Sequence, residues 1–156
     1  MASDAEIDFV EAAVNWLRLE RPEGLPETAS RKGNEGTAII KILAEADLDP
    51  KQRPCVVVIS EGSIRPHPKI AQFSISVDLS YPLDDFDEGT VRGWARAVAA
   101  VFEDSFLVAT KVQDQLEQLG SRWKIRDIRP GSGSAEDEGR RSRMLSDSWR
   151  VWMVRG

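Results

Sequence analysis

Cysteine and histidine are almost missing from this sequence of 156 residues. The single cysteine, Cys55, excludes every disulfide within the chain and every zinc site built from several thiolates. The single histidine, His67, excludes any site that needs a pair of imidazoles. No apolar run approaches the roughly 20 residues that a membrane helix needs, so we expect no membrane partner. The first residues, Met-Ala-Ser-Asp-Ala-Glu, are acidic where a signal peptide is basic, and we therefore expect synthesis in the cytoplasm without a signal peptide.

An excess of positive charge is missing as well. The chain has 21 basic and 26 acidic side chains, a formal net charge of −5, which argues against a dedicated nucleic-acid binder. The charge is unevenly spread: residues 1–104 hold 11 basic and 19 acidic side chains, whereas residues 105–156 hold 10 and 7. A basic end of this kind is typical of a surface for nucleic acid or an acidic partner. It is equally typical of strands whose solvent-facing positions carry arginine.

The length fits one domain, residues 1–156. Hydrophobic periodicity and turn residues predict elements along the whole chain. These are a helix at 4–20, a strand or short helix at 37–46, strands at 55–60 and 70–81, helices at about 91–104 and 108–119, and strands at 123–128 and 144–154. The stretches 21–36, 61–69 and 130–142 are rich in glycine, proline or serine and are predicted to be extended loops or arms. The order predicts an α+β fold: an antiparallel or mixed sheet of about four strands, with an N-terminal helix and two helices packed on one face.

An acidic cluster precedes the helix at 91–104 and is the most obvious candidate for calcium or acid–base chemistry. It consists of Asp84, Asp85, Asp87 and Glu88. A calcium loop that began at Asp84 would need an oxygen ligand at Phe86 and a glutamate at Ala95, so both positions fail. The cluster is better interpreted as carboxylates that cap and charge the start of the helix.

No sequence motif for catalysis or cofactor binding is present, and we expect neither enzymatic activity nor a cofactor. His67 lies between two prolines in a predicted connection, and Cys55 lies within an apolar strand where it is expected to be a small buried residue. A nucleophile elbow requires a strand before it and a helix after it, whereas the stretch Gly-Ser-Gly-Ser at 131–134 is followed by an acidic run and then a predicted strand.

Tryptophan is the unusual residue type, with five among 11 aromatic side chains. Trp149 and Trp152 have opposite parity on the last strand, so they face opposite sides of the sheet. Either both faces of the sheet are covered or one tryptophan faces a partner chain, and we favour the partner because arginines lie beside them. The interface candidates are Trp149, Arg150, Trp152, Arg155, Arg140 and Arg141.

The layout of the chain resembles one known family. The features that carry the resemblance are the leading amphipathic helix, a proline-led apolar strand at 53–58, an alternating strand that ends near 78–82, the acidic cluster, an alanine-rich helix at 94–104, and Arg140 and Arg141 before a terminal Arg-Val-Trp-Met-Val strand. In this order they resemble the tail-terminator and head-to-tail joining (minor tail) proteins of tailed bacteriophages. The resemblance spans residues 37–156, and the long stretch 21–36 departs from it.

The resemblance implies a homo-oligomeric ring, a hexamer, that caps the tail tube protein and joins it to the head-side connector or stopper protein. The protein would belong to the tail or neck of the virion, and DNA would pass through its lumen without specific binding. The acidic cluster at 84–88 is a candidate for the lumen wall, where it would repel phosphates.

Three alternatives remain open. The chain could be a head-completion or connector (stopper) protein of the neck, or a small non-viral α+β domain that binds a ligand or is an enzyme. It could also be a non-phage interaction module whose basic end binds an acidic partner.

Overall fold

A computed structural model describes residues 4–47, 53–131, 135–138 and 142–156 of the chain. Its elements, in chain order, are α1 (Asp4–Leu19), β1 (Thr28–Ser30), the short 3₁₀ helix η1 (Lys32–Asn34), β2 (Thr37–Ile39), β3 (Lys41–Ala44), the 3₁₀ helix η2 (Glu45–Asp47), β4 (Cys55–His67), β5 (Ile70–Pro82), α2 (Glu88–Glu103), α3 (Ser105–Gln118), β6 (Trp123–Pro130), β7 (Ala135–Glu138) and β8 (Ser142–Arg155). The predicted α+β class is confirmed.

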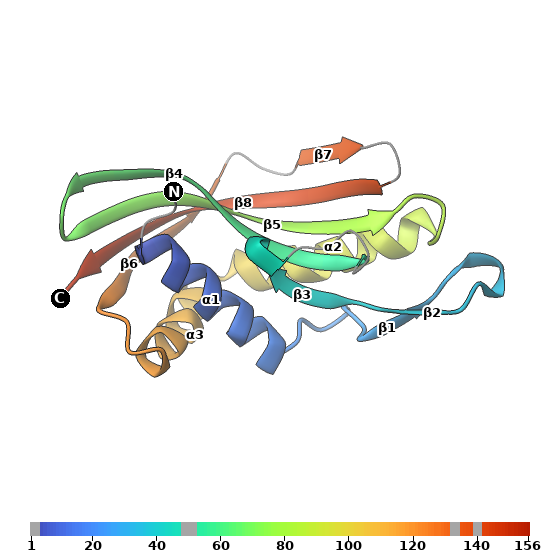
Figure 1. The fold of residues 1–156 in the computed structure, drawn as a ribbon, viewed down its shortest axis with the longest axis horizontal. Coiled ribbons are helices and arrows are strands. Elements are labelled where there is room, and N and C mark those ends of the chain that lie inside the picture. Colours follow the sequence, from blue (N-terminus) through green and yellow to red (C-terminus); the bar gives the residue numbers. More distant parts are fainter. Residues whose placement is uncertain (1–3, 48–52, 132–134, 139–141) are drawn as a thin grey trace.

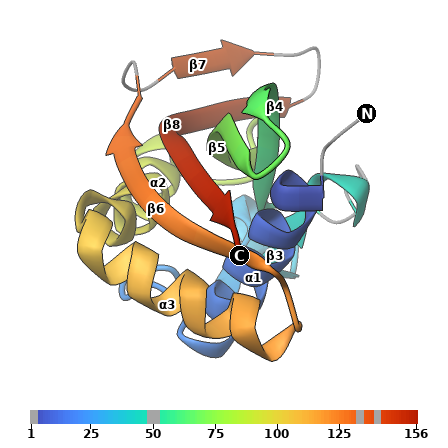
Figure 2. The same ribbon diagram turned by 90° about the vertical axis from the view of Figure 1, so that its left-hand side faces the viewer.

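The main sheet is mixed and has the strand order β3-β4-β5-β8-β6, with β7 also paired to β8. The β3–β4 pair is parallel and the other pairs are antiparallel. This order contains five strands, one more than the approximate number that the sequence predicts. Figures 1 and 2 show all three helices on the same side of this sheet, as the sequence predicts.

The hydrophobic core lies between this helical layer and the sheet. Alternation along β5 and β8 sends the odd-numbered side chains into the core, as the pairs Phe73↔Val151 and Ile75↔Trp149 show. Phe9 of α1 makes an edge-to-face contact with Phe73, with 5.7 Å between ring centroids. All three helices and five strands of the sheet thus share one core.

The helix ends follow local chemistry. Asp104 separates α2 from α3, and its side chain accepts a hydrogen bond from the backbone N–H of Leu107 at 3.0 Å. This cap begins α3 at Ser105, three residues earlier than periodicity predicts. At the other end Gly120 has φ of 73°, and the expected C-terminal glycine is confirmed.

The predicted connection at 61–69 is wrong, because β4 runs to His67 and β5 begins at Ile70. β4 stays paired with β5 over this stretch through two irregularities in β4, one between Glu61 and Ile64 and one between Ile64 and His67. Each places two residues of β4 opposite one of β5. Gly62 and Pro66 fall in these irregularities, where a bulge tolerates residues that otherwise interrupt a strand.

The two other predicted loops are partly strand. Within 21–36, β1 pairs antiparallel with β2 and forms a narrow ribbon, which projects from the body in Figure 1. Within 130–142, β7 pairs with β8, whereas residues 132–134 and 139–141 lie outside the described residues. The ambiguous stretch 37–46 is mostly strand, as its β-branched content favours, and ends in the 3₁₀ turn η2.

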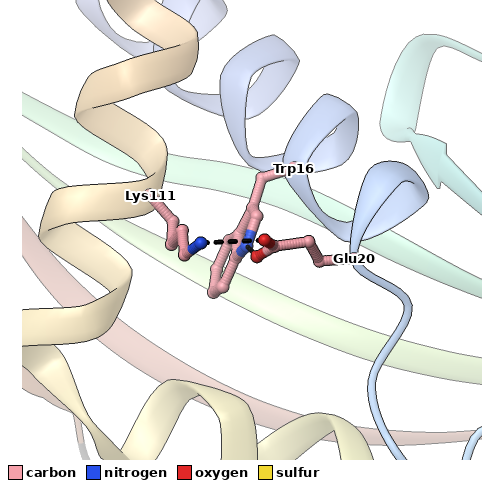
Figure 3. A network of polar contacts seen from close by, with 3 residues as sticks. All are labelled: Trp16, Glu20 and Lys111. Carbon is pink, nitrogen blue, oxygen red and sulfur yellow. Dashed lines mark hydrogen bonds and ion pairs between the residues drawn. The ribbon is translucent and has the colours of Figure 1, made fainter.

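Polar contacts join α1 to α3 (Figure 3). Glu20, just after α1, accepts hydrogen bonds at 2.8 Å both from Lys111 Nζ of α3 and from the indole Nε1 of Trp16. The bond from Lys111, followed by that from Trp16, lowers the pKa of the Glu20 carboxyl.

Side chains also form hydrogen bonds with backbone groups at both edges of the sheet. At the β3 edge, Arg18 Nε donates to the Ile42 carbonyl at 2.9 Å and Arg21 Nη2 donates to the Ile40 carbonyl at 2.7 Å. At the β6 edge, the Ile125 N–H donates to Gln113 Oε1 at 2.9 Å. Arginines of this kind keep an edge strand from pairing with another chain.

Among the described helices, none is both long enough and apolar enough to cross a membrane.

Candidate functional site

The face of the sheet opposite the helices carries the candidate site, and we call it the open face. Strand alternation that sends Trp149 and Val151 into the core turns Arg150 and Trp152 onto the open face. Both side chains are exposed, and 39% of Trp152 is accessible to solvent. The parity argument for the two tryptophans is therefore correct.

A hollow of about 360 Å³ lies on the open face across β5, β8 and β6. We call it the Trp152 hollow and define it by the six open-face side chains that line it: Gln72, Ser74, Asp127, Arg129, Arg150 and Trp152. The sheet register arranges these residues in two rows. One row is Gln72, Trp152 and Asp127, and the other is Ser74, Arg150 and Arg129.

The hollow carries a net positive charge. Arg129 Nε donates to Asp127 Oδ2 at 2.6 Å, so these two charges offset each other. Arg150 lies directly opposite Arg129 and, within the described residues, has neither a hydrogen-bonded nor an ion-paired partner. Two guanidinium groups on paired positions repel each other and favour an anion beside them. The exposed indole of Trp152 supplies apolar contact area next to that charge.

The other predicted interface residues are spread over several places. Trp149 is in the core, with only 5% of its surface accessible and its ring centroid 4.7 Å from that of Phe102. Its inclusion among the interface candidates is corrected for this reason: α2 covers it. Arg155 is exposed at the end of β8, where the strand pairs with Trp123. Arg140 and Arg141 lie outside the described residues.

The structure divides the acidic cluster into paired and unpaired carboxylates. Asp85 Oδ2 lies 3.6 Å from Arg31 Nε, and Glu88 Oε1 lies 3.3 Å from Arg92 Nη2. Asp84 and Asp87 are exposed and have no such partner among the residues that the structure describes. Asp87 is the N-cap residue of α2, but its side chain makes no capping hydrogen bond. The cluster therefore places negative charge at the start of α2, but Asp87 does not cap the helix with a side-chain hydrogen bond.

Asp78 is a buried carboxyl that sequence reasoning missed. It occupies an even, open-face position of β5, yet only 4% of its surface is accessible, and its Oδ1 has no hydrogen-bond partner among the described residues. Burial raises its pKa to about 6, against the lowering effect of a hydrogen bond from Ser76, and nearby Glu61 and Glu45 raise it further. The sequence carried no signal for this burial, because Asp78 follows the same polar alternation as the exposed positions.

The structure gives no arrangement for nucleophilic chemistry at Cys55. The thiol is fully buried and burial raises its pKa, so the reactive thiolate is disfavoured. Over the described ranges, no group of three or more histidine, cysteine, aspartate or glutamate side chains could hold a metal ion. What the described residues do bring together is a surface hollow with arginine and tryptophan side chains, the Trp152 hollow.

A second hollow, of about 340 Å³, lies between α1 and the β3–η2 segment. Its lining mixes apolar side chains with carboxylates, and 52% of Ile7 is accessible there. Glu6, at the same place, is buried and engaged in a contact. Among the described residues that line this second hollow, none is aromatic, unlike in the Trp152 hollow.

Comparison with known proteins adds no assignment: no family model matches the chain, and no curated protein matches it.

Proposed function

We propose that the chain is a structural protein that acts by self-association, in the manner of a phage tail terminator. Copies would form a ring that caps the tail tube and joins it to the head-side connector, with DNA passing through the lumen unbound. The observation that carries the proposal is the exposed Trp152 on the open face beside Arg150, which has no partner among the residues that the structure describes. Tryptophan and arginine are the residue types most enriched where protein partners bind.

Two further features support assembly rather than an isolated domain. The β1–β2 ribbon projects from the body and exposes an apolar side chain, Ile39, with 62% of its surface accessible. In the turn that joins β1 to β2, Lys32 N–H donates to the Asp85 carbonyl at 2.8 Å, which fixes this end of the ribbon against the loop that follows β5. A fixed, projecting ribbon is suited to contact a neighbouring subunit.

Light scattering coupled to size-exclusion chromatography tests this proposal. We expect the wild-type chain to form a discrete oligomer, either alone or after addition of tail tubes, and Trp152→Ala to remain a monomer with an unchanged circular dichroism spectrum. Lys124→Ala is a matched control, because Lys124 is exposed on β6 outside the hollow. A wild-type chain that stays monomeric at high concentration and does not bind tail tubes would contradict the proposal.

One observation favours a second function, a ligand-binding module. The volume of the Trp152 hollow, about 360 Å³, is within the range of small-molecule sites. Its charge would select an anionic ligand. A thermal-shift screen with carboxylates and phosphates separates the two functions, because a monomer that an anion stabilises through Arg150 would support the second one.

A further inference from the structure

We propose that the Trp152 hollow of one copy receives the acidic loop at residues 83–87 of the next copy, with Asp84 and Asp87 as the contacting carboxylates. This inference rests on the proposed self-association and names the surface that completes it. The hollow contributes Arg150 and the face of Trp152, and the loop contributes two carboxylates that have no ion-paired partner among the described residues.

The loop is held in one shape before it binds. Phe86 is buried, and its ring lies edge-to-face against Trp94 with 5.3 Å between centroids. Asp85 forms an ion pair with Arg31, and its backbone carbonyl accepts a hydrogen bond from Lys32 N–H. Asp84 has φ of 67°, so the backbone turns at that residue. Because these contacts fix the loop, Asp84 and Asp87 lose little conformational freedom on binding.

The hollow and the loop lie at opposite ends of β5. The hollow is lined by Gln72 and Ser74 near the start of the strand, whereas the loop follows its last residue, Pro82. Pro82 lies eight residue positions after Ser74, which is roughly 26 Å of extended strand. The loop cannot reach the hollow of its own copy, so the contact has to be made between copies.

A contact between two different surfaces is head-to-tail, and head-to-tail contacts close into rings when the rotation between copies allows it. The charges agree with this arrangement. Within the described part of the chain, the hollow has a cation without an ion-paired partner, Arg150, and the loop has two such carboxylates, Asp84 and Asp87. In a two-fold dimer the same surface of both copies would meet. If that surface were the hollow, Arg150 of one copy would face Arg150 of the other, and the two positive charges would repel each other. On this proposal the acidic loop belongs to the subunit interface rather than to the lumen.

Reversing the charges of the hollow and of the loop tests whether the acidic loop is the segment that binds in the Trp152 hollow. Arg150→Glu makes the hollow acidic, and the pair Asp84→Asn with Asp87→Lys replaces the two contacting carboxylates of the loop by an amide and a cation; asparagine at 84 tolerates the positive φ. We expect each variant alone to self-associate at least about tenfold more weakly than wild type. An equimolar mixture should regain association to within about threefold of wild type, because every contact in an alternating ring then joins opposite charges. Sedimentation velocity measures all three samples.

Arg96→Glu and Asp114→Lys are the matched controls, since both side chains are exposed on helices away from the open face. They should associate as wild type does, and circular dichroism should confirm that every variant is folded. If wild type assembles and Trp152→Ala does not, but the loop variant assembles normally or the mixture is not rescued, the loop is the wrong occupant and the proposed function stands. If wild type does not assemble at all, with or without tail tubes, the proposed function fails and this inference with it.

Discussion

Trp149 and Trp152 are three residues apart on β8 and lie on opposite faces of the sheet. The Trp149 ring packs against Phe102 in the core, whereas the Trp152 ring lies across from Gln72 on the open face. One strand therefore contributes a large aromatic side chain to the core and another to the surface that we propose as the interface. The two substitutions to alanine should have opposite effects on stability and on association.

Trp149→Ala should lower the free energy of unfolding by about 3–5 kcal/mol, because it leaves a cavity beneath α2. Trp152→Ala should change it by less than about 1 kcal/mol, because its ring is already partly in water. Urea unfolding followed by circular dichroism measures both. Equal losses for the two variants would show that the open face is covered within the chain.

Asp78→Asn should make the protein more stable at neutral pH. Burial raises the pKa of Asp78 from its ordinary 3.8 to about 6. The folded chain therefore holds a proton that the unfolded chain releases, and the stability this provides is complete below 3.8 and is lost as the pH rises through about 6. A neutral amide removes this loss, and the expected gain at pH above about 6 is about 1–3 kcal/mol.

Unfolding free energies measured across this pH interval check the Asp78 prediction. Wild type should lose stability relative to Asp78→Asn as the pH rises, and the two curves should run parallel above the interval. Asp114→Asn is the control, because Asp114 is exposed on α3. A difference between wild type and Asp78→Asn that does not vary with pH would rule out the buried carboxyl as its cause.

Glu20 should show a pH dependence opposite to that of Asp78: its contribution to stability should be lost as the pH falls. Its folded-state pKa lies below the ordinary 4.5, chiefly because Lys111 donates to it, so its contribution is present above 4.5 and is lost as the pH falls through the lowered value. Glu20→Gln should therefore unfold at a lower temperature than wild type at neutral pH, and the difference should disappear in acid. Differential scanning calorimetry at several pH values measures it. A difference that persists undiminished in acid would mean that the ion pair with Lys111 is not its source.

Arg21 should be needed to hold the ribbon and the β3 edge in place. Its guanidinium donates to three carbonyls: to Leu25 at 3.0 Å, to Pro26 at 2.6 Å and to Ile40 at 2.7 Å. Lysine cannot reproduce this fork, so Arg21→Lys should cost about 1–3 kcal/mol and should speed proteolytic cleavage within 21–36. Arg92→Lys is the control, because Arg92 lies on an exposed face of α2. Unchanged cleavage in Arg21→Lys would show that the ribbon does not depend on this fork.

Long periodic elements could be predicted from the sequence, but how far pairing with a neighbouring strand extends an element could not. The stripes of α1 and α2 and the alternation of β5 reflect burial on one face, which a single segment records by itself. The extension of β4 to His67 depends instead on pairing with β5, which carries the strand past Gly62 and Pro66. In the same way, β7 is held by β8 and not by its own sequence, Ala-Glu-Asp-Glu.

The candidate site was predictable to a similar degree. Parity on the last strand predicts that Trp149 and Trp152 face opposite sides, and this is confirmed. Which one is exposed depends on the position of α2, which parity does not specify. The register that brings Gln72 and Asp127 to either side of Trp152 depends on the order β5-β8-β6. That order could not be obtained from local pattern, so the hollow itself was not predicted.

The central claim is that copies of this chain associate through the open face of the sheet. Sedimentation velocity of wild type and Trp152→Ala, side by side with and without tail tubes, tests it most directly. We expect a ring-sized species for wild type and a folded monomer for Trp152→Ala under the same conditions. Trp152→Ala that assembles as strongly as wild type would contradict it.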